Sequence, residues 1–171
     1  MAVRINQLQK SRVTRNQRDI LLNFPNLSRK TYRSINPINN MSTPTFHNYA
    51  GIEAKSTQFH FSQAVILGNT IRTSGQGGWQ EDGDIAADLE REVDLAFENV
   101  AKALKAANPD ASWRNVVSMR SYHTDIDASA ELVIERMRVY VPDHRPVWTC
   151  VEISKLGVPG MRVEIEVEAV L

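Results

Sequence analysis

Three glutamates near the end of the chain are the first residues whose type and spacing point to chemistry. Glu164, Glu166 and Glu168 alternate with apolar residues in the segment 162–171, which places all three on one face of a predicted strand. A carboxyl group whose pKa is raised by burial can take a proton from water and return it to a substrate. From the pattern alone, a solvated strand face is the simpler interpretation.

Other reactive side chains are few. The single cysteine, Cys150, is either a small buried apolar residue or a nucleophile. The run Gly75-Gln76-Gly77-Gly78 is not followed by the Gly-Lys-Ser/Thr of a phosphate loop, so we interpret it as a flexible loop. The histidines show no metal-ligand spacing, and we expect surface positions and no metal site for them: His47, His60, His123 and His144.

The elements that must position these residues can be predicted from periodicity. Two strands, 62–67 and 70–74, flank a tight turn at Gly68-Asn69. Apolar steps of three and four predict a helix that starts at Ile85, is capped by Asp84 and stops at Asn108-Pro109. A third strand follows at 115–124. A second helix, 128–140, is capped within 125–127 and ended by Pro142, and two further strands follow at 147–153 and 162–171.

This order, β-β-α-β-α-β-β, predicts an α+β sandwich in which two helices cover one face of a single mixed sheet. The opposite face of the sheet would remain open in a monomer. We expect Val116, Thr149 and Val151 to be half buried there. An open and partly apolar sheet face favours association, so we predict a symmetric homo-oligomer with clefts between subunits.

Composition narrows the class of protein. The chain has 171 residues and 42% apolar residues, which suits one compact domain with or without a tail. Its apolar runs are too short to span a membrane, so we expect no membrane association. One cysteine gives no internal disulfide and fits a reducing compartment, so we expect a cytoplasmic protein.

Charge divides the chain near residue 40. Residues 1–40 carry eight basic side chains and one acidic side chain, and the remainder carries twelve basic and nineteen acidic ones. We therefore separate a basic leader, 1–40, from a folded body, 48–171. Three explanations of the leader remain open: an organelle presequence, which would make the protein mitochondrial, a disordered basic arm, or an over-extended gene model with its true start at Met41. The acidic body argues against nucleic acid as a partner.

Five segments in order resemble the Rid family, also called YjgF, of small trimeric enamine and imine deaminases. They are FSQAVILGNTIRTSGQGG (61–78), the helix containing ENVAKAL, VVSMRSYHTDID (116–127), RPVWTCVEISKLG (145–157) and RVEIEVEAVL (162–171). The resemblance implies a chorismate-mutase-like homotrimer with active clefts between subunits. Imines and enamines hydrolyse readily once water is oriented and the nitrogen can be protonated, so we expect no cofactor or metal.

Site residues follow from the resemblance position by position. Ser74-Gly75 match a Ser-Gly pair that lines the family's cleft, Cys150 matches a cleft cysteine, and Glu164 matches the glutamate that positions the attacking water. Three substrate-binding positions depart from the family. Trp148 stands where the family has a carboxylate-binding arginine, Phe61 replaces a tyrosine, and Val133 replaces an asparagine.

The departures make the predicted cleft less polar, because indole cannot reproduce the two-pronged bond between arginine and a carboxylate. A free 2-imino acid is therefore a poor expected substrate. Arg145 would take over carboxylate binding only if it shared a face with Trp148, and strand alternation argues that it does not.

Three functions remain open. The first is a cofactor-free deaminase of enamines or imines. The second is a trimer that has lost catalysis and binds a metabolite or a partner in its clefts. The third is the ribonuclease or translation-inhibiting activity attributed to some members of the family, against which the acidic body argues.

Overall fold

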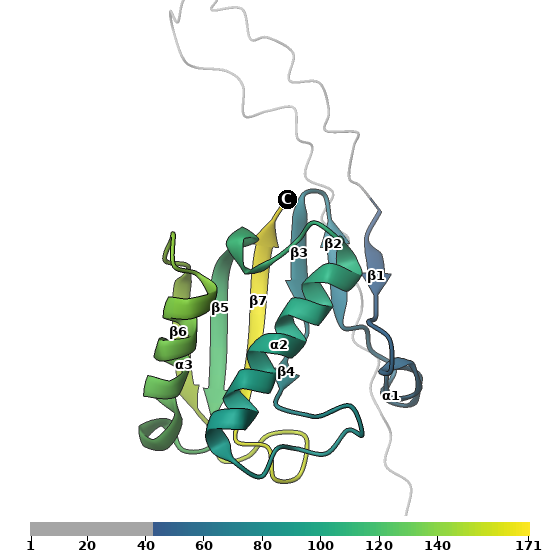
Figure 1. Cartoon of the computed structure of the whole chain (residues 1–171). Coiled ribbons are helices and arrows are strands. Elements are labelled where there is room, and N and C mark those ends of the chain that lie inside the picture. Colours follow the sequence, from purple (N-terminus) through teal and green to yellow (C-terminus); the bar gives the residue numbers. More distant parts are fainter. Residues whose placement is uncertain (1–42) are drawn as a thin grey trace, which may run out of the picture. The chain divides into compact units, whose positions relative to one another are not determined.

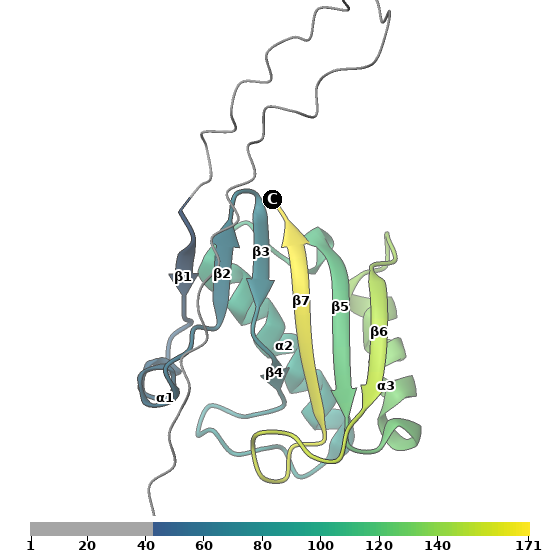
Figure 2. The same ribbon diagram turned by 180° about the vertical axis from the view of Figure 1, so that it is seen from behind.

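A computed structural model describes residues 43–171 of the chain. The basic segment 1–40, and with it every interpretation of the leader, lies outside the described residues. Helices α2 and α3 lie on one face of a single sheet, and the other face has no helix over it (Figures 1 and 2). The elements are β1 (Thr45–His47), α1 (Glu53–Phe59), β2 (Ala64–Leu67), β3 (Thr70–Thr73), β4 (Gln76–Gly77), α2 (Leu89–Ala107), η1 (Trp113–Asn115), β5 (Val116–His123), α3 (Ile126–Tyr140), β6 (Val147–Glu152) and β7 (Val163–Val170).

Strand β7 is central to the sheet, whose order is β1-β2-β3-β7-β5-β6 with β4 also paired to β7. Only β5 and β6 run parallel; the other pairs are antiparallel. The predicted α+β fold with one mixed sheet is therefore confirmed, as are both long helices and the strands of the predicted order. Elements β1, α1 and β4 were not predicted, and β1 lies before the expected boundary at residue 48.

Helix α2 starts four residues later than predicted. Asp88, not Asp84, is its N-cap, and its side chain accepts a hydrogen bond from the backbone N–H of Arg91. The preceding residues cannot join the helix because Ile85 forms a bridge with Trp79 and the Ala86 N–H donates to Gly78 O. The end at Asn108 and the cap of α3 by Asp125 agree with the prediction.

Apolar side chains fill the space between the helices and the sheet. Inward residues of β7 alternate as predicted, with Val163, Ile165, Val167 and Ala169 all buried. Over them, Phe97 of α2 stacks on Trp113 with ring centroids 4.7 Å apart. This core holds β7 in place, and its alternation directs the three glutamates of β7 to the uncovered face.

An ion pair between a buried glutamate and a half-buried arginine fixes the beginning of β7. Glu92 of α2 is fully buried, and its carboxylate accepts hydrogen bonds from the Nε and the backbone N–H of Arg162, both at 2.6 Å. The N–H of Val163 also donates to Glu92 Oε1 at 3.1 Å. The first turn of α2 is thus joined directly to the strand that carries Glu164.

One prediction about the uncovered face was wrong. Val116 is fully buried under the helices, and Val117 is the exposed residue. The register between β5 and β7 shifts between Val116 and Ser118, so the simple alternation of sides is interrupted there. Thr149 and Val151 are exposed and not half buried as predicted, and Val151 is at 36%. Within residues 43–171, none of the helices combines the length and the apolar character that crossing a membrane requires.

Candidate functional site

The three outward glutamates of β7 have different neighbours. Glu166 is paired with Arg120 of β5, whose Nη1 lies 2.7 Å from Oε1, and Glu168 is paired with Arg72 of β3 at 3.1 Å. Within residues 43–171, Glu164 alone of the three has no cation within salt-bridge distance. Glu166 and Glu168 each belong to an ordinary surface ion pair. The interpretation of this strand face as a solvated surface therefore fits these two residues better than it fits Glu164.

Glu164 lies in a half-buried position between two strands. Its register partners are Gly77 of β4 and Tyr122 of β5. Burial raises the pKa of the Glu164 carboxyl group, and the nearby negative charge of Glu166 raises it further. A carboxyl group with a raised pKa and no fixed cation is suited to exchange protons with a substrate.

Gly75 leaves the room that the Glu164 carboxyl group occupies. A Cβ atom at position 75 would lie 1.6 Å from Glu164 Oε1, much closer than two atoms can approach. The φ angle of Gly75 is not positive, so close approach rather than backbone conformation requires glycine here. The structure therefore brings two of the sequence-predicted residues, Gly75 and Glu164, into contact.

Two buried glutamines hold Ser74, and neither was predicted from the sequence. Gln63 O accepts the backbone N–H of Ser74 at 2.9 Å. Gln76 Nε2 donates to Gln63 Oε1 at 2.5 Å and reaches Ser74 Oγ at 3.3 Å. Both glutamines are fully buried. A glutamine directly before the apolar run 64–67 was the only sequence signal for this pair.

The segment before β2 supports the same glutamines. Tyr49 OH donates to Gln76 Oε1 at 3.2 Å and accepts a hydrogen bond from Trp79 Nε1 at 3.1 Å. The side chain of Asn48 accepts the Gln63 N–H. The unpredicted residues around β1 and α1 thus help to place Ser74.

Trp148 and Cys150 lie on the side of the sheet opposite Glu164. They are register partners of Met119 and Ser121, both buried on the helix-covered face of β5, and directly paired residues share a face. Within one chain, then, the predicted residues form two groups, with Gly75 and Glu164 on one side and Trp148 and Cys150 on the other.

The indole N–H of Trp148 is already used inside the chain. It donates to Ser121 Oγ at 2.9 Å, and Ser121 is fully buried. The ring also lines a depression of about 900 Å³ between α3 and the start of β6. Trp148 therefore offers this depression apolar ring surface and no free donor.

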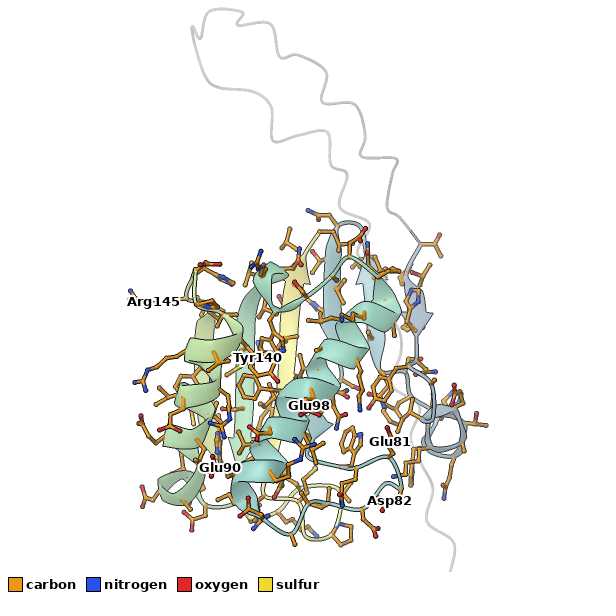
Figure 3. The ribbon with its side chains drawn as sticks, in the orientation of Figure 1. Glu81, Asp82, Glu90, Glu98, Tyr140 and Arg145 are labelled. Atoms are coloured by element: carbon orange, nitrogen blue, oxygen red, sulfur yellow. The ribbon has the colours of Figure 1, made fainter. Side chains whose placement is uncertain are left out.

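Arg145 lines the same depression as Trp148. The prediction that it faces the other side of the strand was wrong because β6 begins at Val147, so strand alternation does not apply to residue 145. Figure 3 shows Arg145 on the turn between α3 and β6, at the edge of the molecule. It is an exposed cation near Trp148.

Phe61 and Val133 differ in accessibility. Phe61 follows α1, is 38% exposed and can contribute to a surface site. Val133 is fully buried in the core beneath α3 and lines no surface of the described chain. The step of three and four along the helix, which places Val133 on its inner side, was the signal that should have removed it from the predicted cleft.

His123 is buried, which contradicts the expected surface position. It ends the inward series Met119, Ser121, His123 on β5, a period of two that the sequence already contained. Its ring nitrogens contact Ser129 Oγ at 2.6 Å and Ser121 Oγ at 2.8 Å. His123 thus joins the hydrogen bonds that reach Trp148.

Comparison with known proteins now settles the family. The model of the family described as endoribonuclease L-PSP matches residues 52–171, which is more than half of the chain and includes every element from β2 to β7. The chain belongs to the YjgF/RidA/L-PSP family, also called Rid. The resemblance drawn from the five sequence segments is confirmed at this level.

Three relatives illustrate the range of this family. The RutC family protein YjgH of Escherichia coli is 30% identical over 70% of this chain and 89% of its own. Protein mmf2 of Schizosaccharomyces pombe, a mitochondrial protein, is 28% identical over 64% of this chain and 85% of its own. TdcF of E. coli, named for a proposed activity as a reactive intermediate deaminase, is 29% identical over 64% and 84%.

Solved structures of two of them share the fold. YjgH superposes with a TM-score of 0.67 at 27% identity, covering 76% of this chain and 98% of its own. TdcF with bound serine superposes with a TM-score of 0.58 at 28% identity, covering 65% and 87%.

Proposed function

We propose that this protein hydrolyses reactive imines or enamines to carbonyl compounds and ammonia, with Glu164 as the acid–base group. One observation carries the proposal: Glu164 is the one outward glutamate of β7 without a cationic partner in residues 43–171, and burial raises its pKa. The relationship to a protein named as a deaminase supports the same reaction class.

The reaction balances with water and one carboxyl group. The Glu164 carboxylate takes a proton from water as the water oxygen bonds to the imine carbon, and the C=N π electrons move to nitrogen. The protonated carboxyl group then gives that proton to nitrogen. The resulting carbinolamine loses ammonia as its hydroxyl oxygen forms the new C=O bond, with the hydroxyl proton passing to the departing nitrogen. No organic cofactor or metal is needed for this balance.

We propose that the complete site forms between protomers of a homotrimer. Glu164 and Trp148 lie on opposite sides of the sheet in one chain, so one protomer would supply Ser74, Gly75 and Glu164, and a neighbour would supply Trp148 and Cys150. The helix-free sheet face supports such an assembly (Figure 2). Phe61 is accessible for a place at the rim.

We propose a substrate preference shifted away from free 2-imino acids. Trp148 offers no free N–H, because Ser121 accepts it, and an apolar ring cannot hold a carboxylate as arginine does. The two arginines that line the depression with this ring, Arg138 and Arg145, are both exposed, and water weakens any charge pair there. A neutral imine, or one whose carboxylate lies far from the imine carbon, fits this arrangement.

We propose no RNA substrate, although the family model carries an endoribonuclease description. Residues 41–171 have seven more acidic than basic side chains. The two arginines of the uncovered face, Arg72 and Arg120, are both neutralised by glutamates, which leaves little for a phosphate backbone to bind.

The test is ammonia release from imines produced in place by an amine oxidase or an amino-acid oxidase. Glu164→Gln should reduce the catalysed rate by roughly 100-fold or more, while Glu168→Gln, the matched change in the same strand, should leave it nearly unchanged. An equal loss in both variants, or no catalysis by the wild type on neutral and anionic imines, would reject the proposal.

The second candidate is a binding protein that turns nothing over. The observation in its favour is the depression beside Trp148, with a largely apolar lining and an indole face exposed to it. In that case tryptophan fluorescence would change on adding a ligand that is recovered intact, and Glu164→Gln would bind the ligand as well as the wild type does.

A further inference from the structure

A buried chain of hydrogen bonds leads away from Trp148. Trp148 Nε1 donates to Ser121 Oγ at 2.9 Å, and Ser121 Oγ lies 2.8 Å from His123 Nε2. On the other side of the ring, His123 Nδ1 lies 2.6 Å from Ser129 Oγ, which donates to the carbonyl oxygen of Asp125 at 2.5 Å. Ser121, His123 and Ser129 are all at most 1% exposed, so water does not complete these bonds.

The two groups at the ends of this series of hydrogen bonds determine the position of every proton in it. A carbonyl oxygen only accepts, so the Ser129 hydroxyl proton points to Asp125 and Ser129 Oγ must accept from His123 Nδ1–H. An indole N–H only donates, so Ser121 Oγ accepts from Trp148 and is free to donate its own proton to His123 Nε2. His123 is therefore neutral, with its proton on Nδ1.

The surroundings of His123 keep it in this form near neutral pH. Burial lowers the pKa of its imidazole, and the carboxylate of Glu152 opposes that effect only in part. Glu152 itself accepts the N–H of Ile126 at the start of α3. A second ring proton would leave the Ser121 hydroxyl proton without an acceptor in this network.

The orientation of Trp148 has a consequence for the depression between α3 and β6. The one polar atom of the indole is bound on the buried side, so the ring contributes carbon surface to a space of about 900 Å³. Ile134, Met137, Val141 and Pro146 line the same space. That volume and lining are typical of small-molecule sites.

We infer that His123 is a positioning residue that, through Ser121, fixes the Trp148 indole as the apolar wall of a subsite for an aromatic or branched aliphatic substituent. This inference deepens the proposed deaminase function. It rests on that function only in assuming that the bound substituent belongs to a substrate. The charged rim residues Arg138, Asp143 and Arg145 lie in the same lining, and the inference assigns them no contact with the substituent.

The protonation pattern is tested by NMR of the full chain labelled with ¹⁵N in histidine and tryptophan. His123 should carry its proton on Nδ1 at neutral pH, and the Trp148 N–H signal should exchange slowly with water. A proton on Nε2 instead, or a rapidly exchanging Trp148 N–H, would overturn the inference.

The specificity is tested with two neutral imines, made by an amine oxidase from benzylamine and from ethylamine. Ser121→Ala should lower the ratio of kcat/KM for the benzyl over the ethyl imine roughly tenfold, through KM. Ser118→Ala is the matched control, because the Ser118 side chain is on the same strand and outside this network. If Ser121→Ala changes kcat/KM for both imines by the same factor, Trp148 has only a structural role and the inference fails.

Two further measurements keep the test decisive. Should Ser121→Ala not fold, Ser129→Ala acts at the far end of the chain and should lower the same ratio about threefold; an unchanged ratio would reject the inference. If no imine is turned over, benzamide replaces the substrate. A shift of the Trp148 N–H signal by benzamide then supports the subsite while the deaminase proposal fails, and no shift rejects the subsite as well.

Discussion

The two ends of β7 present the same side chain to the same face of the sheet in different surroundings. Towards the C-terminal end, Glu166 and Glu168 lie opposite residues of β5 and β3 that include Arg120 and Arg72, and each forms an ion pair. Towards the beginning, Glu164 lies opposite Gly77 and Tyr122, neither of which is charged. The residues on the neighbouring strands, and not the glutamates themselves, therefore decide which glutamate forms an ion pair.

Under the proposed function, one strand carries two ion-paired surface carboxylates and one acid–base group. A carboxylate paired with arginine has its charge balanced and is poorly suited to accept or donate a proton. The half-buried Glu164 keeps its proton more readily than a free glutamate does, because its pKa is raised.

Gly75→Ala should lower kcat for imine hydrolysis roughly 10- to 100-fold, because a displacement of about 1 Å at a reacting group has effects of this size. The added methyl group would coincide with Glu164 Oε1, and the flexible end of that side chain would move away. Gly157→Ala is the control, since a Cβ there meets nothing within 4 Å. Steady-state ammonia release measures both; equal rates in the two variants would contradict the assigned position of Glu164.

Trp148→Arg tests the contrast from the cationic side, because it adds an arginine on the side of the sheet opposite the three glutamates of β7 in the same chain. We expect kcat/KM for an anionic 2-imino acid to rise about tenfold relative to a neutral imine, from the new charge-assisted bonds. Val147→Arg adds the same charge to the neighbouring residue, which is 71% exposed. A gain of the same size in both variants would indicate a general charge effect and not a carboxylate site.

The raised pKa of Glu164 predicts opposite trends in activity and stability with pH. A group that binds its proton more tightly in the folded chain favours folding below its ordinary pKa of 4.5, and this contribution is lost as pH rises through the raised value. Glu164→Gln should therefore unfold at a temperature roughly 1–3 °C higher than the wild type at neutral pH, and at the same temperature below pH 4.5. Wild-type activity should increase over the same pH window as the carboxylate forms. Thermal unfolding followed by circular dichroism checks the first trend, and a lower midpoint for the variant at neutral pH would refute it.

Arg120→Gln should have the smallest effect. It leaves Glu166 without its partner, and the uncompensated charge of Glu166 should raise the pKa of Glu164 further. The midpoint of the pH–rate profile should move to higher pH, while the free energy of unfolding changes by less than about 1 kcal/mol. Arg72→Gln, which frees the more distant Glu168, should move the midpoint less.

Periodicity in the sequence was enough to predict most of the fold. The alternation in 162–171 correctly placed the glutamates of β7 on one face, and the helical spacing located both long helices. It could not give the true start of α2, because Ile85 follows the helical pattern while its backbone is paired with Trp79. The short strand β4 was missed because two residues show no period.

The site was less predictable, because it depends on which residues of different strands become neighbours. That Glu164 lacks a cation follows from the register of β7 with β4 and β5, which no pattern within β7 contains. The Gln63–Gln76 contact and the Trp148–Ser121 bond likewise join residues 13 and 27 positions apart. The burial of Val133 and His123, by contrast, followed from periods present in the sequence.

The Glu92–Arg162 ion pair also determines how the beginning of β7 can open. Its carboxylate holds the amide hydrogens of Arg162 and Val163, so these hydrogens can exchange with solvent only when the first turn of α2 separates from β7. We therefore expect the beginning of the strand that carries Glu164 to open only together with the first turn of the helix. Gly75, which leaves room for the Glu164 carboxyl group, lies between β3 and β4, and both strands pair with β7, so the space around that carboxyl group depends on the same strand pairing.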